Sequence, residues 1–460
     1  MPANRAWKWT AVMVLLFVSI LSGCSGGNNG GKEGNSGELS ANNQANNADA
    51  GTDKSDAGPV TINFWFPWSG DFQKDFKKFV VEPFEASHPN IKVKMTFVEN
   101  SGNTQASDKL LTAVAGGKAP DVALFDRFMV GSWAEKGSLE DLTDLIAKDG
   151  VKPEDYYPSV WKEVNYKDRV YAMPWNTDNR GMYYNKTLMK KAGLDPEQPP
   201  KTIEELDRMA EAMFVKGKNG KFEQVGFIPW MGQGYLFTQG WNFGGQWEKD
   251  GQLTPNDPRI VKALEWMVGY SKKYDTATMN AFSDAAGQSG QNPFISGKVG
   301  FIFDGNWLLN DIEKYKADFE WGVAPMPAPE GYPSITWAGG WSYIMPKGAK
   351  HRDEAWEFIK YVAGKEGVLA WAKRPNAQFD ITCLPAANEE LGMTTKPNMS
   401  VFVNMMQTSF TRPVSPVSGF LWNEMFRVQD LALNNKGNPQ QLLDDVKKNV
   451  DAELAKLKTQ

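Results

Sequence analysis

Tryptophan and aspartate residues recur at the ends of segments that read as β-strands. Trp68 stands before a Ser-Gly-Asp loop, Asp126 directly follows a strand, and Trp341 follows Gly339-Gly340, a pair that would let a ligand approach the backbone. An indole gives the CH face of a sugar ring an apolar plane, and a carboxylate accepts hydrogen bonds from hydroxyls. These residue types in these places predict a carbohydrate-binding site. The alternatives are core packing for Trp68 and a helix N-cap for Asp126.

Five further candidates have the same chemistry. Trp175 and Asp178 lie in a polar loop, where the alternative role is packing at a hinge. Trp230 and Trp241 flank a Gly-rich helix start, and Asp304 comes just before a predicted turn, which is its alternative role. We expect these side chains to contribute to the same site.

The N-terminal segment reads as an export and anchoring signal. Two cationic residues and an apolar run over 11–21, too short to span a membrane comfortably, precede Leu-Ser-Gly-Cys at 21–24. This order predicts a lipoprotein signal peptide over 1–23 and a lipid on Cys24. Residues 24–58 are rich in Gly, Asn, Ser and Ala and predict a flexible tether. An ordinary signal peptide with an incidental cysteine is the alternative.

Charge and residue usage exclude several functions. The chain has a formal net charge of −5, is more acidic without residues 1–23, and has no basic tract, so nucleic acid is not an expected partner. With Cys24 lipidated, Cys383 is the one other cysteine, and no intramolecular disulfide is expected. Two histidines give little material for a metal site or a catalytic triad. We therefore expect no metal and no cofactor.

Two segments match catalytic or phosphate-binding motifs, but their sequence context argues against both functions. Residues 23–27 fit the nucleophile-elbow pattern but straddle the expected cleavage site. Residues 26–32 resemble a phosphate-binding loop, but Glu33 replaces the required Ser or Thr and no strand precedes the loop. A carboxylate pair such as glycosidases use remains open among the 55 acidic residues. A surface-anchored glycoside-active enzyme is therefore the alternative function.

Hydrophobic patterns place these residues on an α/β scaffold. The first elements alternate as strand, helix, strand, helix, strand, which predicts a parallel sheet with right-handed crossovers. Thr202 and Glu205 predict a capping box, and the chain is expected to be mostly helical from residue 352, with a last helix starting at Asn438-Pro439. Strands are expected at 61–66, 91–98, 120–125, 170–173, 181–184, 225–228, 299–303, 321–324 and 341–345, and the first two helices at 72–87 and 106–115.

Five motifs follow one another in the folded part. They are FWFPW (64–68), AVAGGKAPDVALF (113–125), YAMPWNTDNRGMYYNKTLMKKAGL (171–194), SGKVGFIFDGNW (296–307) and WAGGWSYIMPKGAKHRDEAWEFIKYVAG (337–364). In this order they resemble the family 1 extracellular solute-binding proteins, the maltose-binding-protein-like group. Each motif is loose alone, but the set is specific, and the resemblance covers residues 60–460.

The resemblance implies a two-lobed periplasmic-binding-protein fold with the ligand in the cleft between the lobes. It also implies that Arg412 faces the cleft, with an ordinary surface charge as the alternative. The lobes and their three hinge crossovers are then expected as follows: an N-terminal lobe of 59–177 and 300–337, a C-terminal lobe of 178–299 and 338–460, and crossovers near 177–179, 297–300 and 338–341.

The function implied by the resemblance is transport without catalysis. Such a lipoprotein, a monomer on the outer face of the cell membrane, would capture an oligosaccharide or glycoside and deliver it by hinge closure to the membrane subunits of an ABC importer. The fold does not fix the ligand, so a peptide or a metal complex on the same scaffold stays open.

Overall fold

The computed structural model describes residues 58–98, 105–287, 291–375 and 377–457. All of them belong to the second of two units of the chain, Ala57–Gln460. The expected signal peptide and, apart from Gly58, the expected tether lie outside the described residues. None of the described helices is long and apolar enough to cross a membrane.

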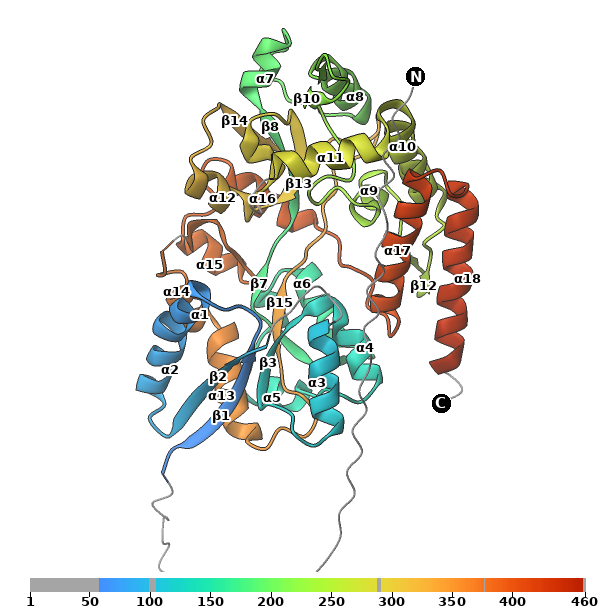
Figure 1. Ribbon diagram of the computed structural model, residues 1–460. Helices are drawn as coiled ribbons and strands as arrows, with labels where there is room; N and C mark the ends of the chain where they lie inside the picture. Colours follow the sequence, from blue (N-terminus) through green and yellow to red (C-terminus); the bar gives the residue numbers. More distant parts are fainter. Residues whose placement is uncertain (1–57, 99–104, 288–290, 376, 458–460) are drawn as a thin grey trace, which may run out of the picture. The chain divides into compact units, whose positions relative to one another are not determined.

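The described elements alternate between strands and helices up to about residue 350, and helices dominate afterwards, as expected (Figure 1). The strands are β1 (Val60–Phe66), β2 (Ile91–Phe97), β3 (Val122–Asp126), β4 (Asn165–Tyr166), β5 (Arg169–Val170), β6 (Ala172–Pro174), β7 (Asn176–Thr177), β8 (Arg180–Asn185), β9 (Val215–Lys216), β10 (Phe222–Gln224), β11 (Glu248–Lys249), β12 (Gln252–Leu253), β13 (Phe301–Gly305), β14 (Trp321–Ala324), β15 (Trp341–Ile344) and β16 (Ile381–Thr382). The helices are α1 (Asp71–Phe76), α2 (Glu82–Ser87), α3 (Gln105–Ala115), α4 (Val130–Glu135), α5 (Thr143–Lys148), α6 (Pro158–Glu163), α7 (Lys186–Lys191), α8 (Ile203–Ala212), α9 (Leu236–Asn242), α10 (Pro258–Tyr274), α11 (Thr276–Ala286), α12 (Leu308–Tyr315), α13 (Arg352–Ala363), α14 (Lys365–Trp371), α15 (Pro385–Glu390), α16 (Met399–Met405), α17 (Ser418–Leu433) and α18 (Pro439–Leu457).

The first sheet has the strand order β2-β1-β3-β15-β6. β1 pairs in parallel with β2 and with β3, which confirms the strand–helix–strand–helix–strand prediction. On β1, the alternate residues Ile62, Phe64 and Phe66 are fully buried, because every second side chain of a strand points to the same face. β15 joins the sheet antiparallel to β3 and to β6.

A second sheet has the order β13-β8-β14, and both pairings are antiparallel. This contradicts the expected lobe boundaries at two places. Residues 300–337 were assigned to the N-terminal lobe, but β13 and β14 satisfy their backbone hydrogen bonds on β8, an element of the expected C-terminal lobe. Residues 338–460 were assigned to the C-terminal lobe, but their first strand, β15, belongs to the first sheet.

Three segments connect elements of the two sheets. One lies between β6 and β8 and one between β14 and β15, close to two of the expected crossovers. The third holds β16, which pairs with β7 and precedes α16, a helix that contacts β8. The crossover expected at 297–300 is wrong: the Asn185 N–H at the end of β8 donates to the Gly300 carbonyl at 2.8 Å, so the chain is already beside the second sheet there.

Several local predictions can be compared with the structure directly. The helix expected at 72–87 is split into α1, a π-helical turn over Lys77–Val81, and α2, which has Pro83 in its first turn, where proline is tolerated. Thr202 and Glu205 form the expected capping box, and α18 begins at Pro439 as expected. The strand expected at 225–228 is wrong, since only Val225 forms a bridge, with Val299.

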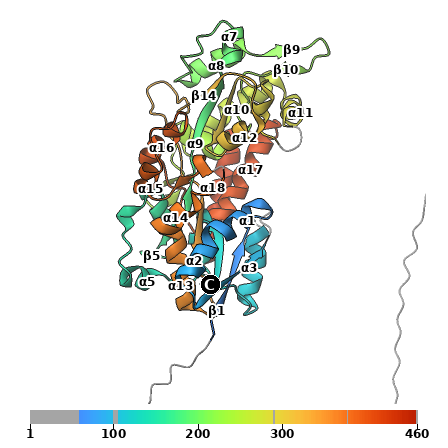
Figure 2. The same cartoon turned by 90° about the vertical axis from the view of Figure 1, so that its left-hand side faces the viewer.

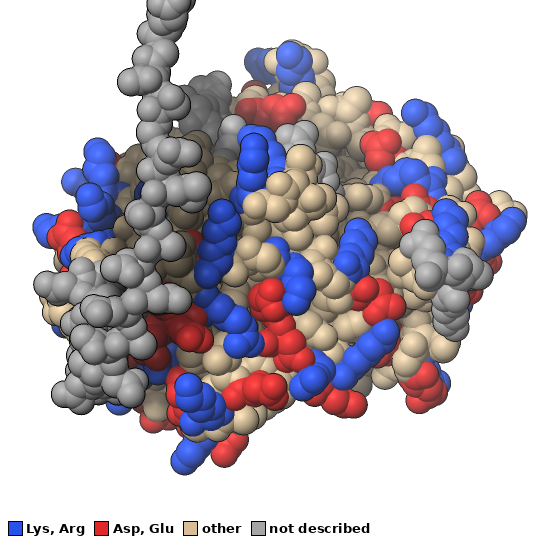
Figure 3. Space-filling model, turned by 90° about the horizontal axis from the view of Figure 1, so that it is seen from below, with Lys and Arg blue, Asp and Glu red and all other residues tan. Residues whose placement is uncertain are grey.

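The remaining elements pack around these sheets. Figures 1 and 2 both place α7, α8 and the β9–β10 hairpin at the same end of the folded unit. On the face that Figure 3 shows, cationic and acidic side chains are interspersed and do not gather into an area of one sign.

Cys383 is free and buried.

Candidate functional site

Two half-buried tryptophans lie side by side at the edge of the first sheet. Trp68 follows β1 and Trp341 begins β15, and their rings meet edge to face with centroids 4.8 Å apart. Trp175 packs against Trp68, with ring centroids 5.9 Å apart, and is only 2% exposed. The packing alternative therefore holds for Trp175, whereas Trp68 and Trp341 keep part of their surface available to a ligand.

Asp126, at the end of β3, is held by two contacts. Its Oδ1 accepts a hydrogen bond from the Phe128 N–H at 2.9 Å, so the N-cap alternative is correct, and it also accepts one from Nη2 of Arg412 at 2.8 Å. The side chain of Asp126 remains 19% exposed, so a ligand can reach part of it. The structure thus places Asp126 next to Trp341, its partner in the β3–β15 pairing.

Arg412 is buried and does not present a free charge. Its Nε donates to Glu163 at 2.6 Å, and its guanidinium lies over the ring of Trp337 at 5.4 Å. Burial lowers the pKa of Arg412, but the carboxylates of Asp126 and Glu163 outweigh burial and raise it, so the guanidinium stays charged. The surface-charge alternative is therefore wrong. Arg412 is instead the buried ion-pair partner of Asp126.

A second buried arginine, Arg127, joins the segments between the sheets. Its Nε donates to Glu163 at 3.1 Å, and its Nη1 donates to the Trp341 carbonyl at 3.2 Å. It also donates to the carbonyls of Asn176 and Gly339. Its Nη1 also lies 3.9 Å from Sγ of Cys383, directly after β16. Because Arg127 thus contacts all three connecting segments, it fixes their relative position.

The Gly339-Gly340 pair has a different role from the expected one. A Cβ on Gly340 would lie 2.7 Å from Nη1 of Arg127, and the φ of Gly340 is +124°. A Cβ on Gly339 would overlap the carboxylate of Asp178. These glycines make room for Arg127 and Asp178, so they need no ligand to explain them.

Polar side chains at the start of β8 form the second part of the site. Asp178 pairs with Arg180, whose Nη2 donates to the Gln233 side chain at 3.2 Å. The Tyr235 hydroxyl donates to the same Gln233 oxygen at 2.6 Å. The guanidinium of Arg180 lies 3.4 Å from the ring centroid of Trp337. Sequence reasoning missed Arg180, Gln233 and Tyr235; an arginine in the polar loop two residues after Asp178 was the available signal.

The last three expected site residues each lie in a different environment. Trp241 is 3% exposed and packs against Phe237 at 4.7 Å, so it belongs to the core. Asp304 is buried, accepts a hydrogen bond from Asn292 at 2.6 Å, and has a pKa raised by burial to about 6. Trp230 is half-buried, and its indole N–H donates to Asn280 at 2.9 Å. Of the three, Trp230 keeps exposed ring surface.

The structure therefore brings two groups of side chains toward the connecting segments. The first sheet supplies the Trp68–Trp341 pair with Asp126, and the second supplies Asp178 with its partners. A bridge between Asp178 and Gly339 links the two groups through the backbone. The set offers aromatic planes together with donors and acceptors, and the described residues contain no group of His, Cys, Asp and Glu that could hold a metal ion.

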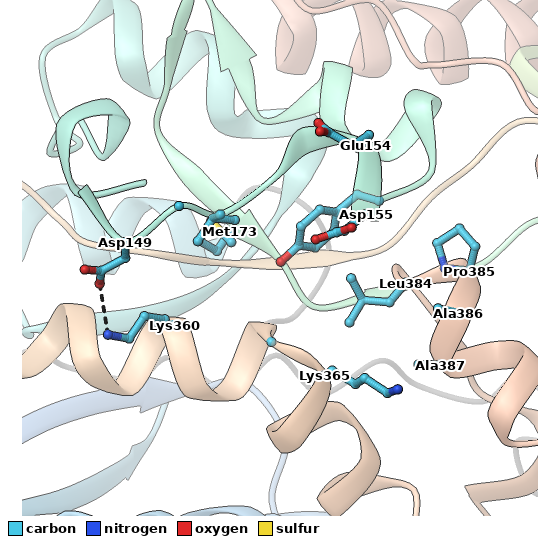
Figure 4. A pocket seen from close by; sticks show the side chains of 14 residues that line it. Asp149, Glu154, Asp155, Met173, Lys360, Lys365, Leu384, Pro385, Ala386 and Ala387 are labelled. Atoms are coloured by element: carbon cyan, nitrogen blue, oxygen red, sulfur yellow. Dashed lines mark hydrogen bonds and ion pairs between the residues drawn. The ribbon is translucent and has the colours of Figure 1, made fainter. Parts of the chain in front are cut away.

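A pocket of about 480 Å³ lies elsewhere, between the end of α5, the α13–α14 turn and α15 (Figure 4). Its charged side chains include Asp149, which pairs with Lys360 at 2.9 Å. Met173 and Leu384 form part of its apolar wall. None of the nine expected ligand-binding residues lines this pocket, so it is not the expected site.

Comparison with known proteins finds binding proteins that match most of this chain. The chain is 28% identical to CpMnBP1, solved with mannotriose bound; the match has a TM-score of 0.74 and covers 85% of this chain and 99% of that one, which confirms the two-lobed fold. The maltotriose-binding protein of Pyrococcus abyssi is 23% identical over 381 residues, 81% of this chain and 77% of the relative. The sn-glycerol-3-phosphate-binding periplasmic protein of Escherichia coli (strain K12) is 24% identical over 348 residues, 70% and 76% of the two chains. Because the family model matches residues 69–368, this chain belongs to the bacterial extracellular solute-binding proteins.

Proposed function

We propose that this protein binds an oligosaccharide and delivers it to the membrane subunits of an ABC importer, without catalysis. The observation that carries the proposal is the half-buried Trp68–Trp341 pair beside the partly exposed carboxylate of Asp126. Stacking surface next to a fixed hydroxyl acceptor suits a sugar ring. The match to a protein solved with mannotriose supports the same ligand class.

The contact residues are those with surface left for a ligand. In the proposal, Trp68, Asp126 and Trp341 hold the glycan from the first sheet, and Asp178 and Trp230 hold it from the second. The other four expected residues, Trp175, Trp241, Asp304 and Arg412, are buried. Two of them position contact residues: Trp175 packs against Trp68, and Arg412 holds Asp126.

Ligand contact with both sheets couples binding to motion. A glycan that touches elements on both sides of the connecting segments favours a closed arrangement by its differential affinity for that arrangement. Arg127 supports this role, because its hydrogen bonds to the Asn176, Gly339 and Trp341 carbonyls hold the connecting segments together while the two sheets move.

Anchoring belongs to the same proposal. Leu-Ser-Gly-Cys at 21–24 supports cleavage after residue 23 and a lipid on Cys24, which would hold the protein, as a monomer, on the outer face of the cell membrane. The composition of residues 24–58 supports a tether that lets the folded unit reach the importer.

Isothermal calorimetry with three solutes tests the ligand class. Mannotriose, maltotriose and sn-glycerol-3-phosphate are titrated into the parent protein and into Trp68→Ala and Asp126→Asn. We expect heat from at least one trisaccharide and a weaker response in both variants. Binding of the phosphoester alone would contradict the sugar proposal. Chromatography of the used trisaccharide checks the enzyme alternative, since shortened product would contradict binding without turnover.

A further inference from the structure

A second pocket, of about 420 Å³, lies between α8 and α10. Only residues of these two helices line it, and none of them belongs to the candidate site described above. Figure 1 shows α8 and α10 close to one another at one end of the folded unit. The pocket is therefore a separate feature of the surface with its own chemistry.

The inner wall of this pocket pairs a carboxylate with two aromatic side chains. The indole N–H of Trp266 lies 3.1 Å from each oxygen of Asp207, and the Tyr270 hydroxyl donates to Asp207 at 2.7 Å. Burial raises the pKa of Asp207, and these hydrogen bonds oppose the rise. A carboxylate held in this way has a fixed orientation and keeps further lone pairs for a ligand. Trp266 is partly buried: its ring packs against Phe243 at 5.3 Å, Tyr270 at 5.4 Å and Phe227 at 5.9 Å, and the side chain also lines the pocket.

Gly269 of α10 is an exposed residue that lines the pocket. Trp266, Gly269, Tyr270 and Lys273 follow the spacing of one helix face. A Cβ on Gly269 would meet no heavy atom within 4 Å, so no packing constraint excludes a side chain there. Glycine in a helix interior is unfavourable compared with alanine. The position thus carries a helix-destabilising residue where a larger side chain would fill the pocket.

Charges around the pocket are balanced. Glu211 and Lys273 form an exposed ion pair at 2.8 Å, and Arg208 has no hydrogen-bond or ion-pair partner among the described residues. Together with Asp207 this gives two acidic and two basic side chains. Such a lining favours neither an anion nor a cation, but it offers both donors and acceptors to a neutral ligand rich in hydroxyls.

We propose that the pocket between α8 and α10 is a second carbohydrate-binding site, which takes a terminal sugar residue of a glycan chain outside the cleft. The sugar ring stacks on Trp266, and its hydroxyls bind Asp207, Glu211 and Arg208. Such a site would retain a long glycan at the protein surface while another part of it enters the cleft. The second site goes beyond the transport function, and its binding of sugar does not depend on which solute the cleft binds; its role in retaining a long glycan rests on the proposed function.

Fluorine NMR of the full chain labelled with 5-fluorotryptophan tests this directly. Trp266→Phe assigns one resonance and Trp341→Phe another, so the pocket and the cleft are read separately in one titration. Mannohexaose, maltohexaose and cellohexaose are the probes. We expect at least one of them to shift the Trp266 resonance saturably in the parent protein. The matched variants are Gly269→Leu, which fills the pocket, and Gly269→Ala, which leaves most of it open.

The expected result is a shift of the Trp266 resonance in the parent and in Gly269→Ala, and an affinity at least about tenfold weaker in Gly269→Leu because the stacking surface is covered. The circular dichroism spectrum of Gly269→Leu checks that this variant is folded. An unmoved Trp266 resonance with all three glycans overturns the proposal, and so does equal affinity in Gly269→Leu and the parent. A shift of Trp266 without a shift of Trp341 would support the second site and contradict the proposed cleft.

Discussion

Nη2 of Arg412 lies 2.8 Å from Oδ1 of Asp126, although 286 positions separate the two residues in the sequence. Both residues were expected to contact the ligand independently. In the structure one of them holds the other, and Glu163 binds the same arginine at 2.6 Å. The acceptor that the proposed function assigns to the sugar is thus oriented by a buried cation from a distant part of the chain.

This ion pair leads to a prediction on stability. Arg412→Met leaves Asp126 and Glu163 without their shared cation, and removing one partner of a buried pair costs about 3–5 kcal/mol in the free energy of unfolding. Urea unfolding measures the loss. Lys74→Ala is the control, because the side chains of the Lys74–Asp71 pair on α1 are 78% and 93% exposed and such a pair is worth less than about 1 kcal/mol. Equal stability of the two variants would show that the buried pair does not support the fold.

The tryptophan pair leads to a prediction on affinity. Trp68→Ala and Trp341→Ala each remove stacking surface worth about 1.5–3 kcal/mol, so the dissociation constant for the bound trisaccharide should rise about ten- to a hundredfold. Trp161→Ala serves as the control, since Trp161 is half-buried against Tyr156, away from the pair. Calorimetry measures all three. If both site variants bind as tightly as the control, the indoles serve the core and the site is misplaced.

Asp304 leads to a prediction on pH dependence. Burial raises its pKa to about 6 in the folded protein, above the usual value of a carboxyl in an unfolded chain, which is about 4. Protonated Asp304 therefore favours the folded state, and this contribution is complete below about pH 4 and is lost as the pH rises through 6. The difference between these two pKa values corresponds to roughly 3 kcal/mol in the free energy of unfolding. Between pH 4 and 7 the stability of Asp304→Asn, relative to the parent, should increase; a constant difference would contradict the raised pKa.

Gly340 leads to a prediction on the connecting segments. In Gly340→Ala the new Cβ would lie 2.7 Å from Nη1 of Arg127 and against the Asn176 carbonyl, on a backbone with φ +124°. Gly348→Ala is the matched control, with φ +87° and open space around the Cβ, so it should cost only the conformational strain of about 1–2 kcal/mol. Thermal unfolding should show a clearly larger loss for Gly340→Ala. Similar losses would mean that Arg127 gives way easily.

Cys24 leads to a prediction on location. Because Leu-Ser-Gly precedes it, Cys24→Ser should release the protein from the membrane fraction or leave it mislocalised, without changing the melting temperature of the folded unit. Fractionation followed by immunoblotting measures this. A variant that is processed normally and still sediments with membranes would argue against a lipid on Cys24.

Local pattern was enough for much of the scaffold. The alternation of Ile62, Phe64 and Phe66 predicts β1 and its buried face, the Thr202–Glu205 pair predicts the cap of α8, and β14 has the predicted bounds. Each of these depends on neighbours within a few residues, where backbone geometry fixes the spacing. The wrong strand at 225–228 shows the limit, because an apolar run does not say whether a partner strand is available.

By itself, the sequence determined the α/β class, several of the strands and helices, the family resemblance and the residue types of a sugar site. Only the tertiary structure decided which candidates keep exposed surface: it buried Trp175 and Trp241 and left Trp68 and Trp341 half open. It also placed β13 and β14 on β8, and paired Asp126 with Arg412. The physical reason is common to these results. Burial, strand partners and ion pairs depend on segments that are distant along the chain, and no local pattern specifies which of them meet.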